Sequence, residues 1–200
     1  RLDNLRKSIE ADVKGRAASV EEEIKFAFDR TDDAAYVLDL HKKGLIPLRV
    51  THNDTKLNNI LFDANTDLPV CVIDLDTIMP GYSVNDFGDS IRFGASTAAE
   101  DEKDISKVWM DLSLFESYAK GFLKGCGGLL TKDEIMLMPE GAKMMTIECG
   151  MRFLTDYLEG DTYFKTKYQD HNLDRCHTQF KLVADMESKW DKMKDIVKNI

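Results

Sequence analysis

The sequence has no long apolar run, and its uninterrupted hydrophobic stretches are only a few residues long. A helix that crosses a bilayer needs about 20 apolar residues, so no membrane span is predicted, and no signal-peptide pattern opens the chain. Basic residues are also scarce, with 27 Lys and Arg against 36 Asp and Glu and a formal net charge of −9. Because no basic patch interrupts this acidity, we expect no nucleic-acid partner, whose phosphates the chain would repel.

Cysteine is sparse as well, with only four residues of this type. None forms a C-x-x-C pair, and their spacings match no zinc pattern. Cys71 and Cys149 lie in apolar segments, where each is expected to be a small buried residue. Reduced thiols in a cytoplasmic protein are the simplest interpretation.

The apolar residues that are present, 43% of the total, suffice for the core of one domain or one large lobe of 200 residues. Their spacing predicts helices over most of the chain. The helical segments are expected within residues 3–29, 34–40, 108–122, 144–158 and 182–197. Gly125, Gly127 and Gly128, and further on Gly160, are expected to end two of them.

Two short apolar runs, residues 60–62 and 70–73, flank a segment with turn chemistry at 63–67. This pattern predicts a β-hairpin. Pro80 and Gly81 are expected to form a further turn. The predicted fold is therefore α+β and mostly helical, with one small hairpin.

Residues 52–59, immediately before the hairpin, read His-x-Asp-x-x-x-x-Asn. This is the spacing of a phosphoryl-transfer catalytic loop, in which an Asp receives a hydroxyl proton and an Asn holds a metal ion. Asp54 is the candidate base. Asn59 and Asp74, the residue at the far end of the hairpin, are candidate ligands of Mg²⁺, which prefers hard oxygen atoms.

Four further residues near this motif have candidate roles. Lys56 is expected either to stabilise charge on the transferring group or to be a solvated surface lysine. His52 is expected to hold the loop backbone, and Asp76 to be a second metal ligand or a hydrogen-bond partner. Residues 86–88 spell the metal-binding tripeptide of protein kinases, but no strand precedes them, so Asp86 is expected to cap a helix.

These motifs resemble the aminoglycoside phosphotransferase and choline kinase-like superfamily. The longer strings at residues 51–59, 72–77, 86–93 and 152–158 are similar to the N-acetylhexosamine 1-kinases, over about residues 45–170. The resemblance implies a protein-kinase-like C-terminal lobe whose hairpin carries the catalytic and metal residues. It implies transfer of phosphate from ATP, with Mg²⁺, to the anomeric hydroxyl of N-acetylglucosamine or N-acetylgalactosamine.

The resemblance also implies site residues: Asp54 as base, Asn59 and Asp74 on Mg²⁺, and Asp54, Lys56, Arg152 and Tyr163 facing the sugar. From residue type alone, Arg152 is equally an exposed helix charge. Tyr163 either stacks on a sugar ring or closes a loop.

No Gly-rich loop precedes residue 44 and no strand-borne Lys is found, although the family's nucleotide lobe has both. Residues 1–200 are therefore expected to be the C-terminal, substrate-binding lobe alone, with poor nucleotide binding and little turnover. Three alternatives stay open. They are another acceptor such as an aminoglycoside, choline, homoserine or a methylthioribose-like sugar, a non-catalytic binding module, and a metal-dependent phosphoesterase that uses Asp74 and Asp76.

Overall fold

The computed structural model describes residues 1–200, apart from the side chains of residues 33–35. The helices are α1 (Leu2–Ala11), α2 (Glu21–Phe28), α3 (Thr31–Lys42), α4 (Ser83–Gly94), α5 (Leu112–Gly125), α6 (Lys132–Met136), α7 (Met138–Glu159), α8 (His171–Ser188) and α9 (Trp190–Lys198). The strands are β1 (Arg49–Thr51), β2 (Ile60–Phe62), β3 (Pro69–Val72) and β4 (Met79–Gly81). The predicted class, mostly helical α+β with small antiparallel sheets, is confirmed. Among the described residues, no helix is both long and apolar enough to cross a bilayer.

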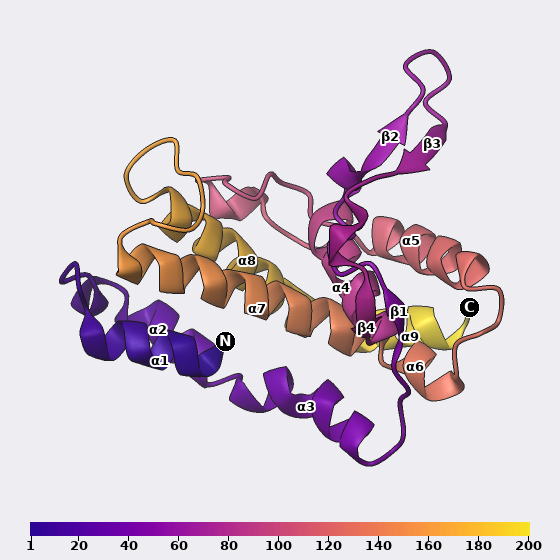
Figure 1. Ribbon diagram of the computed structural model, residues 1–200, viewed down its shortest axis with the longest axis horizontal. Coiled ribbons are helices and arrows are strands. Elements are labelled where there is room, and N and C mark those ends of the chain that lie inside the picture. Colours follow the sequence, from indigo (N-terminus) through magenta and orange to yellow (C-terminus); the bar gives the residue numbers. More distant parts are fainter.

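Helix α7 forms the axis of the molecule, and the other helices lie around it (Figure 1). Its 22 residues carry apolar side chains on more than one face, because two cores meet on it. Leu154 and Leu158 are fully buried in a core with α1, α2 and α8. Met138 and Ala142 are fully buried in a second core with α4, α5 and α9. Gly160, in the left-handed conformation at φ 95°, ends α7 as the sequence predicted.

Helices α4 and α7 cross at two glycines. A Cβ atom added to Gly88 would lie 2.2 Å from the carbonyl oxygen of Gly141, and one added to Gly141 would lie 2.3 Å from that of Val84. The close approach therefore requires glycine at both positions. Phe87, beside this contact, is fully buried. The tripeptide at 86–88 is thus part of a packed helix crossing.

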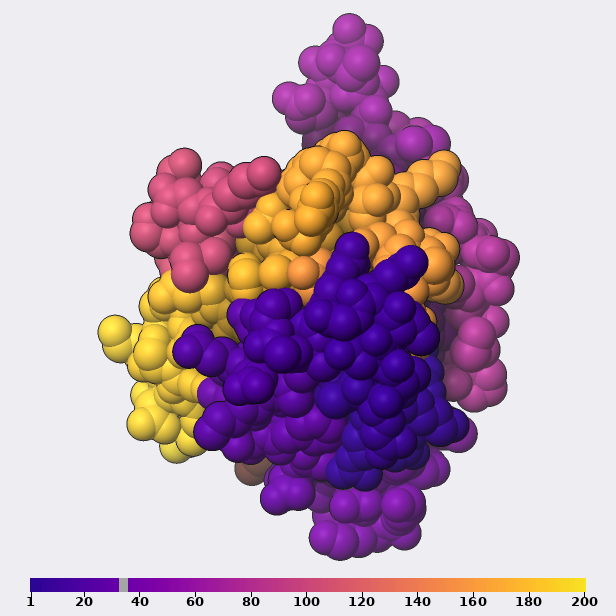
Figure 2. All heavy atoms as spheres, turned by 90° about the vertical axis from the view of Figure 1, so that its left-hand side faces the viewer, coloured from indigo at the N-terminus to yellow at the C-terminus, as the bar shows by residue number. Residues whose placement is uncertain are grey.

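The strands form two separate antiparallel pairs, β1 with β4 and β2 with β3. The predicted hairpin is β2–β3, with Ile60 opposite Val72. It projects from the helical body and is exposed on more than one side (Figures 1 and 2). Cys71 is consequently exposed, so its predicted burial was wrong, whereas Cys149 is buried as predicted.

Two other local predictions were wrong. Pro80 and Gly81 do not form a turn but belong to β4, where Pro80 faces Val50 of β1. β4 pairs on one side only, and an edge strand tolerates a residue that lacks a backbone N–H donor. The helix predicted over 182–197 is broken at Lys189, whose ammonium group bonds Asp185 at 2.6 Å and the Met110 carbonyl oxygen at 2.8 Å.

Candidate active site

The loop between β1 and the short 3-10 helix Leu57–Asn59 carries the predicted base. The Oδ2 atom of Asp54 accepts hydrogen bonds from Lys56 Nζ and from Asn59 Nδ2, each at 2.9 Å. Asn59 Nδ2 also donates to the Asp54 carbonyl oxygen at 2.8 Å. Asn59 is buried, whereas the side chains of Asp54 and Lys56 are partly exposed. One carboxylate oxygen is thus held between a cation and an amide at the protein surface.

This arrangement keeps Asp54 ionised. Partial burial raises the pKa of its carboxyl, but the hydrogen bonds from Lys56 and Asn59 and the charge of Lys56 outweigh burial, so the pKa lies below its ordinary value. At neutral pH the group is therefore ionised and can accept a hydrogen bond from a hydroxyl group. Its low basicity suits a reaction in which the acceptor is oriented first and deprotonated late.

Helix α4 holds the backbone of this loop through hydrogen bonds. Asp86 accepts the backbone N–H groups of His52 and Asn53 through its two carboxylate oxygens, both at 2.8 Å. Asn53 has a positive φ of 65°, so the loop backbone needs this support. Burial raises the pKa of Asp86, and the two backbone hydrogen bonds offset part of that rise.

The prediction that Asp86 caps a helix was wrong. Helix α4 begins at Ser83, and the N-cap residue before it, Tyr82, makes no side-chain capping bond. Asp86 lies one turn inside the helix and binds the amides of a different segment instead. The local sequence resembled a helix start because Ser83, Asn85 and Asp86 are all polar and short.

Sequence analysis missed Asp89, which performs the same task one turn further along α4. Its Oδ2 atom accepts the backbone N–H of Thr55 at 2.8 Å. The guanidinium of Arg92 holds the other oxygen of Asp89 at 3.2 and 3.1 Å and also binds Glu100 at 2.6 Å. The only signal in the sequence was the i, i+3 spacing of two Asp residues on one helix face.

Hydrogen bonds join the far end of the hairpin to the same loop. Ile73 donates its backbone N–H to the Asn59 carbonyl oxygen at 2.9 Å, which brings the following residue, Asp74, beside the loop. His52 donates from Nε2 to the Ile73 carbonyl oxygen at 3.2 Å, and its own carbonyl accepts from Thr77 at 2.6 Å. These contacts fit the structural role predicted for His52.

Asp74 and Asp76 are both exposed, and Asp74 has a positive φ of 64°. Among the described residues, no group of three or more His, Cys, Asp or Glu side chains is placed to hold a metal ion. Asn59 and Asp74 would instead offer one amide and one carboxylate oxygen. The amide nitrogen of Asn59 is bound to Asp54, and no described residue donates to its Oδ1 atom. This donor set fits a hard cation that completes its shell with phosphate oxygens and water.

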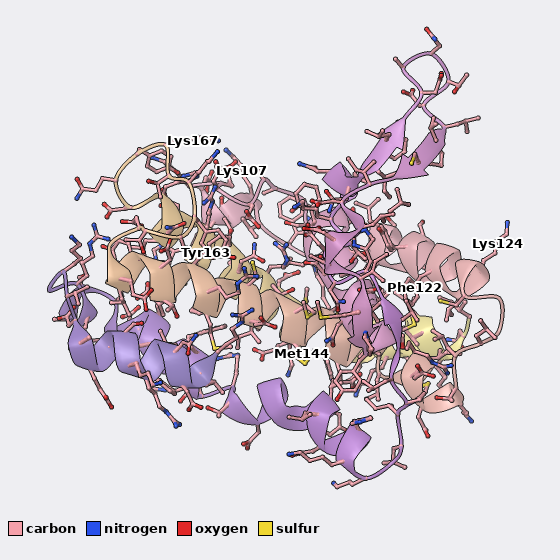
Figure 3. The ribbon with its side chains drawn as sticks, viewed as in Figure 1. Lys107, Phe122, Lys124, Met144, Tyr163 and Lys167 are labelled. Atoms are coloured by element: carbon pink, nitrogen blue, oxygen red, sulfur yellow. The ribbon has the colours of Figure 1, made fainter. Side chains whose placement is uncertain are left out.

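Tyr163 lies beside the C-terminal half of α7 (Figure 3), and Arg152 of that helix meets it there. The guanidinium carbon of Arg152 lies 5.9 Å from the ring centroid of Tyr163 and 5.3 Å from that of Phe164. The three residues line a pocket of about 250 Å³ together with Arg1, Asn4, Thr155, Asp156 and Glu159. Its volume is below the roughly 300–1,000 Å³ typical of sites for drug-sized ligands, so it suits a small one.

The predicted site residues thus form two groups. Asp54, Lys56 and Asn59 contact one another, and Arg152 contacts Tyr163. Neither Asp54 nor Lys56 lines the pocket. The two groups are connected through the packing of α4 on α7, because α4 holds the loop and α7 carries Arg152.

A helical lobe with a small projecting hairpin, and an Asp, Lys and Asn joined on one loop, define a phosphoryl-transfer class of protein. Residues 1–107 match the phosphotransferase enzyme family, APH. The chain therefore belongs to this family, whose members include aminoglycoside phosphotransferases and choline kinase-like enzymes. The match covers the loop, the hairpin and Asp86, whereas Arg152 and Tyr163 lie outside it.

Proposed function

We propose that this chain transfers the γ-phosphate of ATP to the anomeric hydroxyl of an N-acetylhexosamine, N-acetylglucosamine or N-acetylgalactosamine. Membership of the phosphotransferase family supports the reaction class. The observation that carries the proposal is the single carboxylate oxygen of Asp54 that both Lys56 and Asn59 bind. The choice of sugar rests on the string similarity described above and on the pocket beside Arg152 and Tyr163.

In this mechanism Asp54 accepts a hydrogen bond from the acceptor hydroxyl and aims its oxygen at the phosphorus atom. Positioning of this kind supplies most of the catalysis in phosphoryl transfer, because little covalent chemistry is required of the protein. The proton passes to Asp54 as the bond from the acceptor oxygen to the γ-phosphorus forms and the bond from that phosphorus to the bridging oxygen breaks, with ADP as the leaving group. Lys56, at 2.9 Å from Asp54, places a positive charge where the transferring group becomes more negative.

Asn59 and Asp74 are the residues that would hold Mg²⁺. The cation, when bound there, would supply positive charge to the nucleotide phosphates. The bond from Asn59 Nδ2 to Asp54 turns the amide oxygen away from the base. Asn59 therefore separates the two tasks, with its nitrogen orienting the base and its oxygen left for the cation.

We also propose that residues 1–200 act as the substrate-binding lobe and that ATP is bound jointly with a nucleotide lobe. The exposed apolar surface around the hairpin supports this, because monomeric proteins rarely leave large contiguous apolar patches uncovered. Val50 is 82% exposed and Val70 is 68% exposed, and Phe62, Val72 and Met79 are each about half exposed.

The test is ATP-dependent phosphorylation of a panel of alcohols by the complete native protein with Mg²⁺. The panel contains N-acetylglucosamine, N-acetylgalactosamine, kanamycin, choline and homoserine. We expect phosphate transfer to the two N-acetylhexosamines. The Asp54→Asn variant should lose about 10²–10⁴ in turnover, since general-base assistance is typically worth that much.

Asp191→Asn is the matched control, because Asp191 is highly exposed on α9 and far along the chain from the loop. It should keep wild-type turnover. Near-wild-type activity of Asp54→Asn would remove the assignment of the base. If kanamycin, choline or homoserine is phosphorylated and the N-acetylhexosamines are not, the proposed acceptor is wrong. Binding of Mg-ATP without transfer to any alcohol would favour a binding module.

A further inference from the structure

The last turn of α7 contains a buried carboxylate that binds three consecutive backbone amides. Asp156 is 3% exposed. Its Oδ1 atom accepts the N–H groups of Thr162 and Tyr163 at 2.9 and 2.8 Å. Its Oδ2 atom accepts the N–H of Phe164 at 3.0 Å and the side-chain amide of Asn172 at 2.8 Å.

Such a carboxylate determines the shape of the segment around it. A buried charge is costly unless hydrogen bonds satisfy it, and four donors converge on Asp156. The segment leaves α7 through Gly160 and Asp161, both at positive φ, and turns back over the helix end. Asn172, at the start of α8, also donates to Asp161 at 2.9 Å, so both ends of the segment are tied to one point.

This segment presents Tyr163 to the pocket. Tyr163 is 73% exposed, and its ring meets that of Phe164 edge-on, with 4.8 Å between the ring centroids. Phe164 packs in turn on Phe153 of α7, also with 4.8 Å between centroids. The backbone of Tyr163 itself is held by Asp156, while Arg16 and Asn172 bind Asp161 two residues earlier.

We propose that Asp156 is a positioning residue for the acceptor, because it fixes Tyr163 beside Arg152 and so sets the affinity of the pocket for a sugar ring. The inference rests on the proposed function, which places the acceptor in this pocket. A pyranose presents an apolar C–H face and a rim of hydroxyl groups. The ring of Tyr163 can pack against the apolar face, and the guanidinium of Arg152 can donate hydrogen bonds to the hydroxyl groups.

The experiment is a double-mutant cycle on acceptor binding. The Kd values of the complete native protein for N-acetylglucosamine and N-acetylgalactosamine are measured by titration calorimetry for wild type, Asp156→Asn, Tyr163→Ala and the double variant. Hydrogen exchange is measured at the amides of residues 162–164. Asn at 156 presents an NH₂ group to donors, so part of the amide network is lost.

We expect Asp156→Asn to weaken sugar binding about 10-fold or more and to speed exchange at those amides. Tyr163→Ala should then add little in the double variant, because residues that act as a unit are not additive. Asp185→Asn is the matched control, since Asp185 also accepts a backbone amide, that of Met110 at 2.7 Å, but does not line the pocket. It should lower the melting temperature without changing either Kd.

Wild-type affinity in folded Asp156→Asn, or effects that simply multiply in the double variant, would overturn the inference. If Asp156→Asn does not fold, Asn172→Ala decides, because it removes only one donor from Asp156 and should weaken binding about threefold in the same direction. An unchanged Kd in that variant also overturns the inference. If wild type binds neither sugar, the proposed acceptor itself is wrong, a result that the wild-type titration alone identifies.

Discussion

The crossing of α4 and α7 gives the sharpest test of how the site is held. In Gly88→Ala, the new methyl group would lie 2.2 Å from the carbonyl oxygen and 2.5 Å from the carbonyl carbon of Gly141. Ordinary contact begins at about 3.4 Å, so the two helices must separate by more than 1 Å. Neither atom of Gly141 can rotate away, since both belong to the backbone.

The expected loss follows from two opposing effects. Overpacking of this kind destabilises by about 1–3 kcal/mol, and a rigid backbone contact belongs at the upper end. Replacing Gly by Ala inside a helix also stabilises that helix by about 1 kcal/mol, which offsets part of the loss. We therefore expect Gly88→Ala to lower the free energy of unfolding by about 2 kcal/mol. For a chain of this size that is a fall of about 4–8 °C in melting temperature.

Gly121→Ala is the matched control, because Gly121 lies inside α5 and a Cβ atom there would meet nothing within 4 Å. The same substitution should stabilise the protein by about 1 kcal/mol. Thermal unfolding followed by circular dichroism measures both changes. Equal stabilisation by the two substitutions would refute the close approach of α4 and α7.

The same variant tests the site. Helix α4 carries Asp86 and Asp89, which hold the catalytic loop. A displacement of about 1 Å in a catalytic group can lower turnover 10²-fold. Gly88→Ala should therefore lose activity at temperatures where it remains folded. Full activity of the folded variant would show that the loop does not depend on the position of α4.

Two further predictions concern titration. In Lys56→Ala, the pKa of Asp54 should rise, because burial remains while a hydrogen bond and a positive charge are lost. The acidic limb of the pH–rate profile should then move to higher pH. An unmoved limb would show that the ionisation of Asp54 does not control the reaction rate. Burial raises the pKa of Glu134, but bonds from Arg49, Thr131 and Ser83 lower it to about 2 from 4.5. The ionised Glu134 should thus contribute about 3 kcal/mol to the free energy of unfolding above pH 4.5, and this contribution should be lost as the pH falls towards 2. Urea unfolding at several pH values should show this loss in the wild type but not in Glu134→Gln.

The sequence predicted local features of the site better than long-range ones. Asp54 and Asn59 are five positions apart, so a loop spacing was enough to place them together, and the structure joins them by hydrogen bonds. The hairpin was also predictable, because two apolar runs on either side of a turn segment determine it locally. Arg152 and Tyr163 were brought together only by resemblance, since a contact across the end of α7 leaves no periodic signal.

The support of the loop was not predictable for the same reason. Asp86 binds the amides of His52 and Asn53, more than 30 positions earlier in the chain. No local sequence pattern reveals that a carboxylate will accept hydrogen bonds from the backbone of a distant segment. The polar residues around Asp86 also fit the start of a helix, which is the interpretation that the sequence favoured. Asp156 was hidden in the same way, within a segment that reads only as an amphipathic helix.

Both groups of site residues are therefore held by aspartates that bind backbone amides, of which Asp89 and Asp156 are buried and Asp86 is partly buried. Asp86 and Asp89 hold the catalytic loop from α4, and Asp156 holds the segment with Tyr163 from α7. The crossing at Gly88 joins the two helices. Phosphoryl transfer needs the acceptor oxygen in line with the phosphate to within a fraction of an ångström. In the proposed mechanism, Asp54 as the base is held from α4 and the pocket for the acceptor lies beside α7, so the two can meet that demand only if the crossing is rigid. The close backbone contact between Gly88 and Gly141 provides that rigidity.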